Sequence, residues 1–214
     1  MRIGVLGTGD VGRVLGAGFA SHGHQVMIGS RDPKQDKVQA WVKATGHAAS
    51  AGTFAETAAF GEIAVLATSW EGTESALGLA GPKQLAGKVV IDATNPLDFS
   101  QGAPPRLAVA GNDSAGETVQ RRLPGARVVK AFNIVGNPHM VHPDFPGGPP
   151  DMFICGDDDA AKGTVTGLLK AFGWPVTDVG GIASSRYLEA MAMVWILYFF
   201  KTGSGNHAFK MLTK

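Results

Sequence analysis

Three glycines near the start of the chain are spaced to hold a phosphate group. The segment at residues 7–12 reads GTGDVG and directly follows an apolar run at residues 3–6. Gly7 permits a tight turn, Gly9 lacks the Cβ that would block a pyrophosphate, and Gly12 lets a following helix lie close to the strand. Free backbone N–H groups and the dipole of that helix would face the phosphates. The pattern predicts the first βα turn of a dinucleotide-binding domain.

The end of the second apolar run, residues 24–28, indicates which nicotinamide cofactor is bound. A domain that binds NAD usually has Asp or Glu here to hold the ribose 2′-hydroxyl, whereas this chain has Ser30 followed by Arg31. A hydroxyl, a guanidinium and the nearby ammonium of Lys34 can each donate to a 2′-phosphate, which a carboxylate would repel. We therefore expect NADP. In the alternative, Arg31 and Lys34 are solvated surface charges and Asp32 binds the ribose.

Polar residues follow three further apolar runs. These segments are Thr68-Ser69-Trp70, residues 92–97 and residues 133–138. Each lies where the carboxyl ends of parallel strands meet ligand in a doubly wound sheet. The alternative for Asp92, Thr94 and Asn95 is that they only cap a turn. We expect Trp70 to contact a ligand or a lid, because an indole N–H beside a core strand needs a partner.

Composition excludes several classes of function. The chain of 214 residues has 19 basic and 18 acidic residues, a formal charge of +1, so it lacks the electrostatic footprint of a nucleic-acid-binding protein. The lone Cys155 forms no internal disulfide and indicates a reducing compartment, with the cytoplasm as the expected location. His139, His142 and Asp144 resemble a metal triad, but prolines interrupt their segment, and we expect no metal.

The apolar run at residues 190–200 is the one stretch that resembles a membrane span. It is too short to cross a bilayer and is bounded by Glu189 and Lys201. It predicts a buried helix, and since the run is apolar on all faces, its expected partner is the same helix of a second subunit. We expect a homodimer, no membrane anchor, and no targeting segment before the first strand.

Apolar runs alternate with helical patterns along the chain, which is typical of parallel strands joined by crossover helices. Strands are expected at residues 2–6, 25–29, 63–67, 89–93, 127–132, 152–155 and 176–179. Helices are expected at residues 11–22, 34–45, 53–59, 73–79, 115–123, 158–172 and 185–201. The predicted fold is a Rossmann-type, doubly wound α/β sheet with a small C-terminal α/β extension. Residues 1–137 would bind NADP, and residues 138–214 would complete the substrate pocket and the dimer interface.

Four segments of the chain resemble the coenzyme F420-dependent NADP reductases. They read GTGDVGRVLGAGFASHGHQVMIGSR, IAVLATSW, ICGDDDAAK and SSRYLEAMAMVWILYFFKTGSGNHAFKML, and the last two are the most specific. The resemblance implies hydride transfer between a nicotinamide and a deazaflavin. It also implies that Thr8 contacts phosphate, that Ser30 and Arg31 hold the 2′-phosphate, and that Val135 backs the nicotinamide. Asn133 stands where the family's histidine is expected, so the chain departs from the family pattern on the acceptor side.

The expected chemistry needs little more than two stacked rings. Positioning supplies most of the acceleration, and the cofactors supply the electronics. Trp70, Asn133 and Val135 would form the floor on which the second ring lies, and Asn133 would donate a hydrogen bond to the negative charge that arrives on that ring. The expected cofactor contacts are Gly7, Thr8, Gly9, Asp10, Val11, Gly12, Ser30, Arg31, Lys34, Thr68, Ser69, Trp70, Asn95 and Val135. The alternatives are a reductase of a flavin, quinone or imine, and an NADP sensor without turnover.

Overall fold

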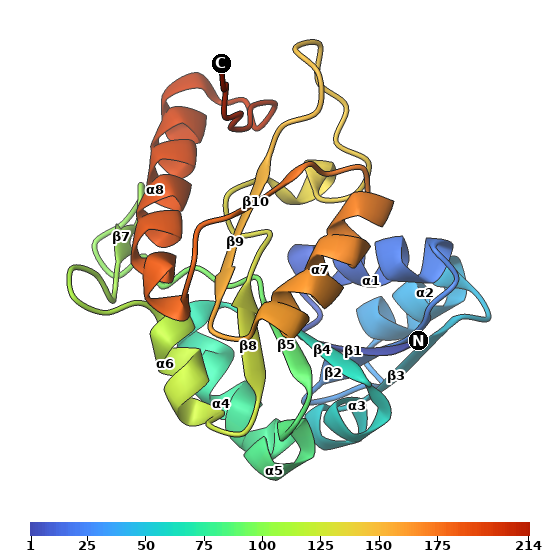
Figure 1. Cartoon of the computed structure of the whole chain (residues 1–214). Helices are drawn as coiled ribbons and strands as arrows, with labels where there is room; N and C mark the ends of the chain where they lie inside the picture. The colour runs from blue at the N-terminus through green and yellow to red at the C-terminus, as the bar shows by residue number, and fades with distance from the viewer.

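The central feature of the computed structural model, which describes all 214 residues, is one eight-stranded sheet between two layers of helices (Figure 1). In chain order its strands are β1 (Arg2–Leu6), β2 (Gln25–Ser30), β3 (Ala49–Thr53), β4 (Ile63–Leu66), β5 (Val89–Asp92), β8 (Arg127–Lys130), β9 (Met152–Gly156) and β10 (Val176–Asp178). The spatial order is β10-β9-β8-β5-β4-β1-β2-β3, parallel from β3 to β8. This order, with its reversal between β1 and β4, confirms the predicted Rossmann-type fold.

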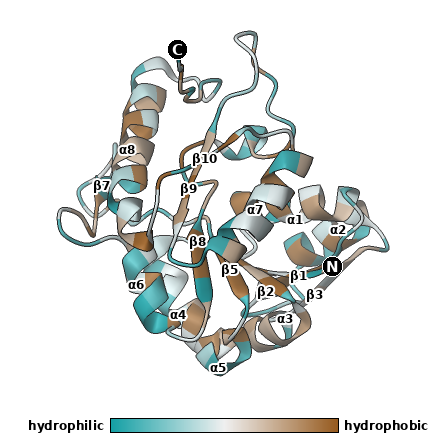
Figure 2. Cartoon of the chain, viewed as in Figure 1, coloured by the Kyte–Doolittle hydropathy of each residue, from teal (hydrophilic) through white to brown (hydrophobic).

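Helices cover both faces of the sheet. They are α1 (Asp10–Ser21), α2 (Asp36–Thr45), α3 (Phe54–Phe60), α4 (Trp70–Ala80), α5 (Pro82–Leu85), α6 (Ala115–Arg122), α7 (Asp159–Ala171) and α8 (Ser185–Thr202). Helices α1, α2 and α7 pack on one face, and α3 to α6 pack on the other. The inner strands are buried on both sides, which explains their continuous apolar runs (Figure 2).

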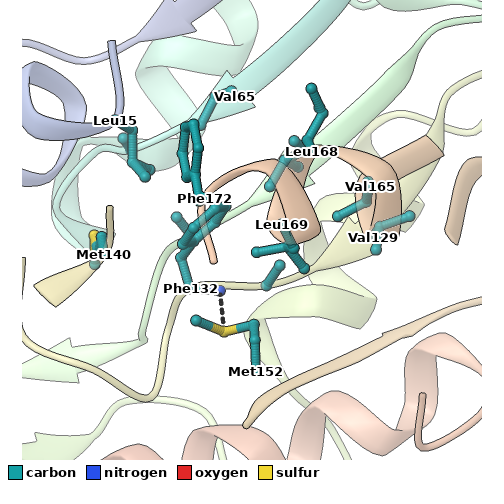
Figure 3. Close-up of a cluster of buried hydrophobic side chains, with 14 of the residues drawn as sticks. Leu15, Val65, Val129, Phe132, Met140, Met152, Val165, Leu168, Leu169 and Phe172 are labelled. Atoms are coloured by element: carbon teal, nitrogen blue, oxygen red, sulfur yellow. Dashed lines mark hydrogen bonds between the residues drawn. The ribbon is translucent and has the colours of Figure 1, made fainter. Parts of the chain in front are cut away.

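Figure 3 shows the larger core, where Phe172 at the end of α7 packs on Phe132 and Leu15. The backbone N–H of Phe132 there faces the sulfur of Met152 at 3.2 Å. Phe132 has a φ of +66°, a left-handed conformation that no strand can accommodate. For this reason β8 ends at Lys130, two residues before the predicted end.

The structure contains elements that the sequence did not predict. Strand β3 has the sequence ASAGT, whose small residues carry no alternating apolar pattern, yet it pairs in parallel with β2. A two-stranded hairpin of β6 (Leu97–Asp98) and β7 (Arg106–Leu107) stands apart from the main sheet. Helix α4 begins at Trp70, three residues earlier than expected. Short or weakly patterned elements are those that local sequence specifies least.

The C-terminal segment joins the main sheet. Strand β9 pairs antiparallel with β8, and β10 pairs parallel with β9, so residues 138–214 extend the sheet of residues 1–137. Helix α8 stands at one edge of the molecule (Figure 1), where it contacts α6. The expectation that this helix is buried is wrong for the single chain, because Val194, Leu197 and Tyr198 are about half exposed. None of the helices combines the length and the apolarity needed to cross a bilayer.

Candidate functional site

A cleft with two lobes lies at the carboxyl ends of the parallel strands. The β2 lobe, of about 620 Å³, is lined by residues that include Gly7, Thr8, Gly9, Ser30, Arg31, Gln35, Lys37, Thr68, Ser69 and Glu71. The β5 lobe, of about 890 Å³, is lined by residues that include Gly9, Asp10, Val11, Thr68, Ser69, Trp70, Thr94, Asn95, Leu97, Asp98, Phe99, Ala108 and Asn137. The two lobes share the glycine turn and the segment after β4. An elongated ligand can therefore lie across the strand ends at the point where strand order reverses.

The three glycines of the first turn are required for different structural reasons. Gly7 has a φ of +127°, and a side chain there would collide with the carbonyl of Ala67. At Gly12 a side chain would collide with the carbonyl of Gly7, so this glycine lets α1 pack closely on β1. Gly9 instead faces open space, since a Cβ there would meet no atom within 4 Å. Gly12 therefore allows close packing of α1 against the turn, while Gly9 leaves space in the cleft for a ligand.

The start of α1 offers backbone donors to an anion. Gly9 is the N-cap of this helix, and no side chain caps it. The first N–H groups of a helix have no partner within it, and the helix dipole favours negative charge at this end. Asp10 and Val11 line the β5 lobe directly after Gly9. Because phosphate binds well at such helix ends, the geometry fits the predicted phosphate-binding turn.

The end of β2 supplies the positive charge of the cleft. Ser30 is buried and lines the β2 lobe together with the exposed Arg31. Asp32 does not line the lobe, and its Oδ1 accepts the backbone N–H of Lys34 at 3.0 Å. The lysine that reaches the lobe is Lys37, on the first turn of α2, and the prediction for Lys34 is corrected accordingly. The geometry favours Ser30 and Arg31 over the alternative in which Asp32 binds the ribose.

Apolar and hydroxyl side chains line the β5 lobe. Thr68 and Ser69 follow β4, and the hydroxyl of Thr68 lies 2.8 Å from that of Thr73. Trp70 is half-buried at the start of α4 and lines the lobe, and its contact with a ligand stays a prediction. Leu97 and Asn137, which belong to the expected segments 92–97 and 133–138, also line it, together with Phe99 and Ala108, which were not predicted. Leu97, Phe99 and Ala108 belong to the β6–β7 hairpin or its flanks, which the sequence pattern did not reveal.

Asn133 and Val135 lie behind the lining of the cleft. Both are buried, and neither lines either lobe. The Nδ2 group of Asn133 donates to Asn95 Oδ1 at 3.1 Å and to the carbonyl of Leu188 at 3.0 Å. Its two hydrogens are thus used within the chain. The predicted roles, a donor to the acceptor ring for Asn133 and a nicotinamide contact for Val135, do not match these positions.

Asn95 lines the β5 lobe, and its amide is held by hydrogen bonds to Asn133. Its Nδ2 donates one hydrogen to the carbonyl of Asn133 at 2.7 Å, which leaves the second hydrogen for a ligand. Its Oδ1 accepts from Asn133, so the orientation of the amide is fixed by two bonds. Asn133 therefore positions Asn95, and a donor that is held rigidly in this way can meet charge that develops on a bound ring.

An ion triad is buried beneath the β5 lobe. Lys130 Nζ lies 2.9 Å from Asp92 Oδ2 and 2.8 Å from Glu189 Oε1, and none of the three side chains is more than 1% exposed. Burial lowers the pKa of Lys130, but the two carboxylates outweigh that effect and hold the pKa above its usual value. Local sequence patterns could not predict this pairing, because its members lie on three separate elements, β5, β8 and α8.

The triad connects the lining of the cleft to two helices. Asp92 Oδ1 accepts the backbone N–H of Thr94 at 2.9 Å and its hydroxyl at 2.7 Å. Glu189 of α8 accepts the backbone N–H groups of Ala115 and Gly116 at the start of α6. The turn-capping alternative thus holds for Asp92, whereas Thr94 lines the lobe. These bonds fix the loop after β5 relative to α6 and α8.

The remaining reactive side chains lie outside the cleft. Cys155 is buried in β9, and burial raises the pKa of its thiol to about 11. Its Sγ lies 3.3 Å from the hydroxyl of Ser185 at the start of α8. His139, His142 and Asp144 do not form a cluster that could hold a metal. The residues that line the two lobes all lie before residue 138, and the completion of the pocket by residues 138–214 stays a prediction.

Comparisons with known proteins agree on one family. The model of the family "NADP oxidoreductase coenzyme F420-dependent" matches residues 2–96. The F420-dependent NADP reductase of Methanocaldococcus jannaschii is 31% identical over 207 residues, which cover 92% of this chain and 91% of that protein. The crystal structure of a candidate F420-dependent NADP reductase from Arthrobacter sp. FB24 superposes with a TM-score of 0.94, at 40% identity over the full length of both chains.

A metalloreductase is also similar to this chain. The metalloreductase STEAP3 of Rattus norvegicus is 31% identical over 197 residues, which cover 90% of this chain. The matched region is 36% of that protein, so the chain spans about a third of its length.

Proposed function

The chain belongs to the family of F420-dependent NADP oxidoreductases, and from this premise we propose that it transfers hydride between NADP(H) and a deazaflavin of the F420 type. The observation that carries the proposal is the two-lobed cleft. One lobe combines an anion-binding helix end with Ser30, Arg31 and Lys37, and the other presents flat apolar surfaces. A dinucleotide that spans both lobes would place its charged end on the first and its ring in the second.

The residues of the β2 lobe fit a nucleotide that carries a 2′-phosphate. Ser30 and Arg31 would donate to that phosphate, and Lys37 would add charge from α2. The open space above Gly9 leaves room for the pyrophosphate beside the first N–H groups of α1. The last residue of β2 is Ser30 and not a carboxylate, and the one carboxylate that lines this lobe, Glu71, comes from α4. These positions support NADP over NAD.

The residues of the β5 lobe position and stabilise the reacting rings. When bound, NADPH supplies a hydride from its nicotinamide ring to a second ring stacked at about 3–3.5 Å. Thr68 and Ser69 would contact the carboxamide end, and Trp70 would limit the movement of the rings. The second hydrogen of Asn95 Nδ2 would meet negative charge on the acceptor. None of these roles needs a catalytic acid.

A panel of acceptors tests the proposal. The protein is incubated with NADPH and with F420, FMN, FAD, riboflavin, quinones or cyclic imines, and the oxidation of NADPH is followed at 340 nm. We expect turnover with the deazaflavin. Turnover with a different acceptor alone would contradict the acceptor assignment and retain the reductase. Binding of NADPH without any turnover would support a non-catalytic NADP sensor and contradict the proposed enzyme.

One observation favours a different acceptor as the second candidate. Asn133, which stands where the family's histidine was expected, does not line the lobe, and its Nδ2 group is bonded to Asn95 and to the carbonyl of Leu188. The similarity of this chain to a protein named a metalloreductase supports an acceptor other than a deazaflavin. A flavin, a quinone or an imine would fit a lobe of about 890 Å³.

Replacing Arg31 with aspartate tests the 2′-phosphate site. The change removes a charge-assisted donor worth roughly 1.5–3 kcal/mol and adds a repelling carboxylate, so we expect the Kd of NADPH to rise by about 30- to 100-fold. The affinity for NADH should change by less than about threefold. The matched control is Lys34→Asp, three residues away but outside the lobe, which should affect neither nucleotide. Equal losses for NADPH and NADH in Arg31→Asp would remove the NADP assignment.

We also propose that the protein is a homodimer joined through α8. This helix exposes Tyr187, Val194, Leu197 and Tyr198, and the segment between Tyr187 and Lys201 contains one charged residue, which is buried. An apolar, uncharged stripe that meets its own copy gives a closed two-fold interface.

Leu197→Glu is expected to convert the dimer into a monomer, because the interface would bury an unpaired carboxylate next to its symmetry mate. Light scattering coupled to size-exclusion chromatography measures the mass. The control is Leu79→Glu, a similarly exposed leucine on α4, which should leave the mass of the dimer unchanged. A wild-type protein that is monomeric at micromolar concentration would contradict the proposal.

A further inference from the structure

The two lobes of the cleft differ in the sign of their charge. The charged residues that line the β2 lobe are Arg31, Lys37 and Glu71, so its side chains carry a net positive charge. The β5 lobe is lined by Asp10, Glu71 and Asp98, and no lysine, arginine or histidine lines it. Apart from the backbone N–H groups at the start of α1, the charged groups that a ligand end meets in the β5 lobe are therefore all negative.

Cations near these carboxylates lie outside the lobe. Arg13 pairs with Asp10 from the next turn of α1, and it lines a separate groove between α1 and α2. Arg106 of β7 stands opposite Asp98 in the hairpin register, yet it does not line the lobe. Glu71 makes no ion pair. These arginines offset part of the negative charge but do not line the lobe, so the carboxylates are the charged side chains that a bound ring would meet there.

The uncharged walls of the lobe suit a flat ring. Trp70 is half-buried on one side, and Phe99, which is 55% exposed, follows β6 on the hairpin. Leu97 and Ala108 add apolar surface from the same hairpin. Exposed aromatic side chains beside a cavity gain most from a ring that stacks on them. Phe99 is thus placed to contact the acceptor.

We infer that the β5 lobe selects acceptors by charge: it takes a neutral or cationic planar ring and disfavours phosphate or carboxylate groups on the part that enters. This inference rests on the proposed function, since it concerns the acceptor of the same reaction. Carboxylates a few ångströms from a phosphate repel it even in water. An acceptor with an anionic tail, such as F420, would bind with its ring in the lobe and its tail directed out of it.

Riboflavin and FMN form a matched pair for the test, because they differ by one phosphate. Their binding to the NADP⁺-saturated protein is measured by isothermal titration calorimetry at low ionic strength. We expect riboflavin to bind at least ~10-fold more tightly than FMN. The affinity for FMN should rise as salt screens the repulsion, whereas that for riboflavin should stay constant.

Two variants of the hairpin identify the source of the discrimination. Asp98→Lys should bring the FMN affinity up to that of riboflavin or above it, and the neutral Asp98→Asn should give an intermediate ratio. FMN binding as tightly as riboflavin to the wild type, a salt-independent ratio, or failure of both rings to bind would each overturn the inference. A failure of the proposed function is recognised separately, as NADPH that no acceptor oxidises while the binding preference is retained.

Discussion

A Gly9→Val protein should fold as the wild type does and bind NADPH at least ~100-fold more weakly. The structure leaves open space above Gly9, since a Cβ there would meet no atom within 4 Å, and the side chain would project into the space shared by both lobes. A bound pyrophosphate would be displaced from the first turn of α1. The loss of two charge-assisted hydrogen bonds, at roughly 1.5–3 kcal/mol each, accounts for this magnitude. Titration calorimetry with NADPH measures it.

Gly12→Ala is the matched comparison within the same turn. Its Cβ would collide with the carbonyl of Gly7, so this change should lower the midpoint of thermal unfolding, in contrast to Gly9→Val. The two variants thereby separate the loss of a ligand site from the loss of a packing contact. If Gly9→Val bound NADPH within threefold of the wild type, the pyrophosphate could not cross the turn at Gly9. The placement of the nucleotide would then be wrong.

The parts of the fold that sequence predicted well are those with strong local signals. Residues 2–22 combine a buried apolar run, a glycine turn and a helical pattern, and the structure has β1 and α1 there within one residue. Strand β3 lacks such a signal, because ASAGT is neither apolar nor alternating. It is a strand because β2 offers a free edge and α2 brings the chain back beside it. That cause lies in the tertiary structure, which a local pattern does not contain.

In the candidate site, too, some residues could be predicted from local sequence signals and others could not. Ser30 and Arg31 were predicted because the end of β2 has a fixed position relative to the glycine turn. The choice between Lys34 and Lys37 depends on the residue at which α2 begins, which the sequence does not specify well. Phe99 belongs to a hairpin of four paired residues, too short to leave a pattern in the sequence. Asn133 was placed correctly after β8, but the direction of its side chain depends on Leu188 of α8. Sequence therefore predicted positions along strands better than orientations of side chains.

The buried triad was the least predictable feature, and its disruption should have a large effect on stability. Replacing Lys130 with methionine keeps most of the side-chain volume but leaves Asp92 and Glu189 facing each other with no cation in a region that is at most 1% exposed. Removing one partner of a buried ion pair typically costs about 3–5 kcal/mol, because an uncompensated charge remains in the interior. We expect a loss of that size in the free energy of unfolding, measured by urea denaturation followed by circular dichroism.

Two comparisons show whether charge, and not packing, causes the loss. In the triple variant Lys130→Met, Asp92→Asn, Glu189→Gln no buried charge remains, so we expect it to recover part of the stability lost by Lys130→Met alone. Arg122→Met breaks the exposed pair with Glu74 and should change the free energy of unfolding by less than about 1 kcal/mol. If the triple variant were less stable than Lys130→Met, the loss would come from hydrogen bonding to Thr94 and to α6. The triad would then serve to hold the loop after β5, and its charges would be secondary.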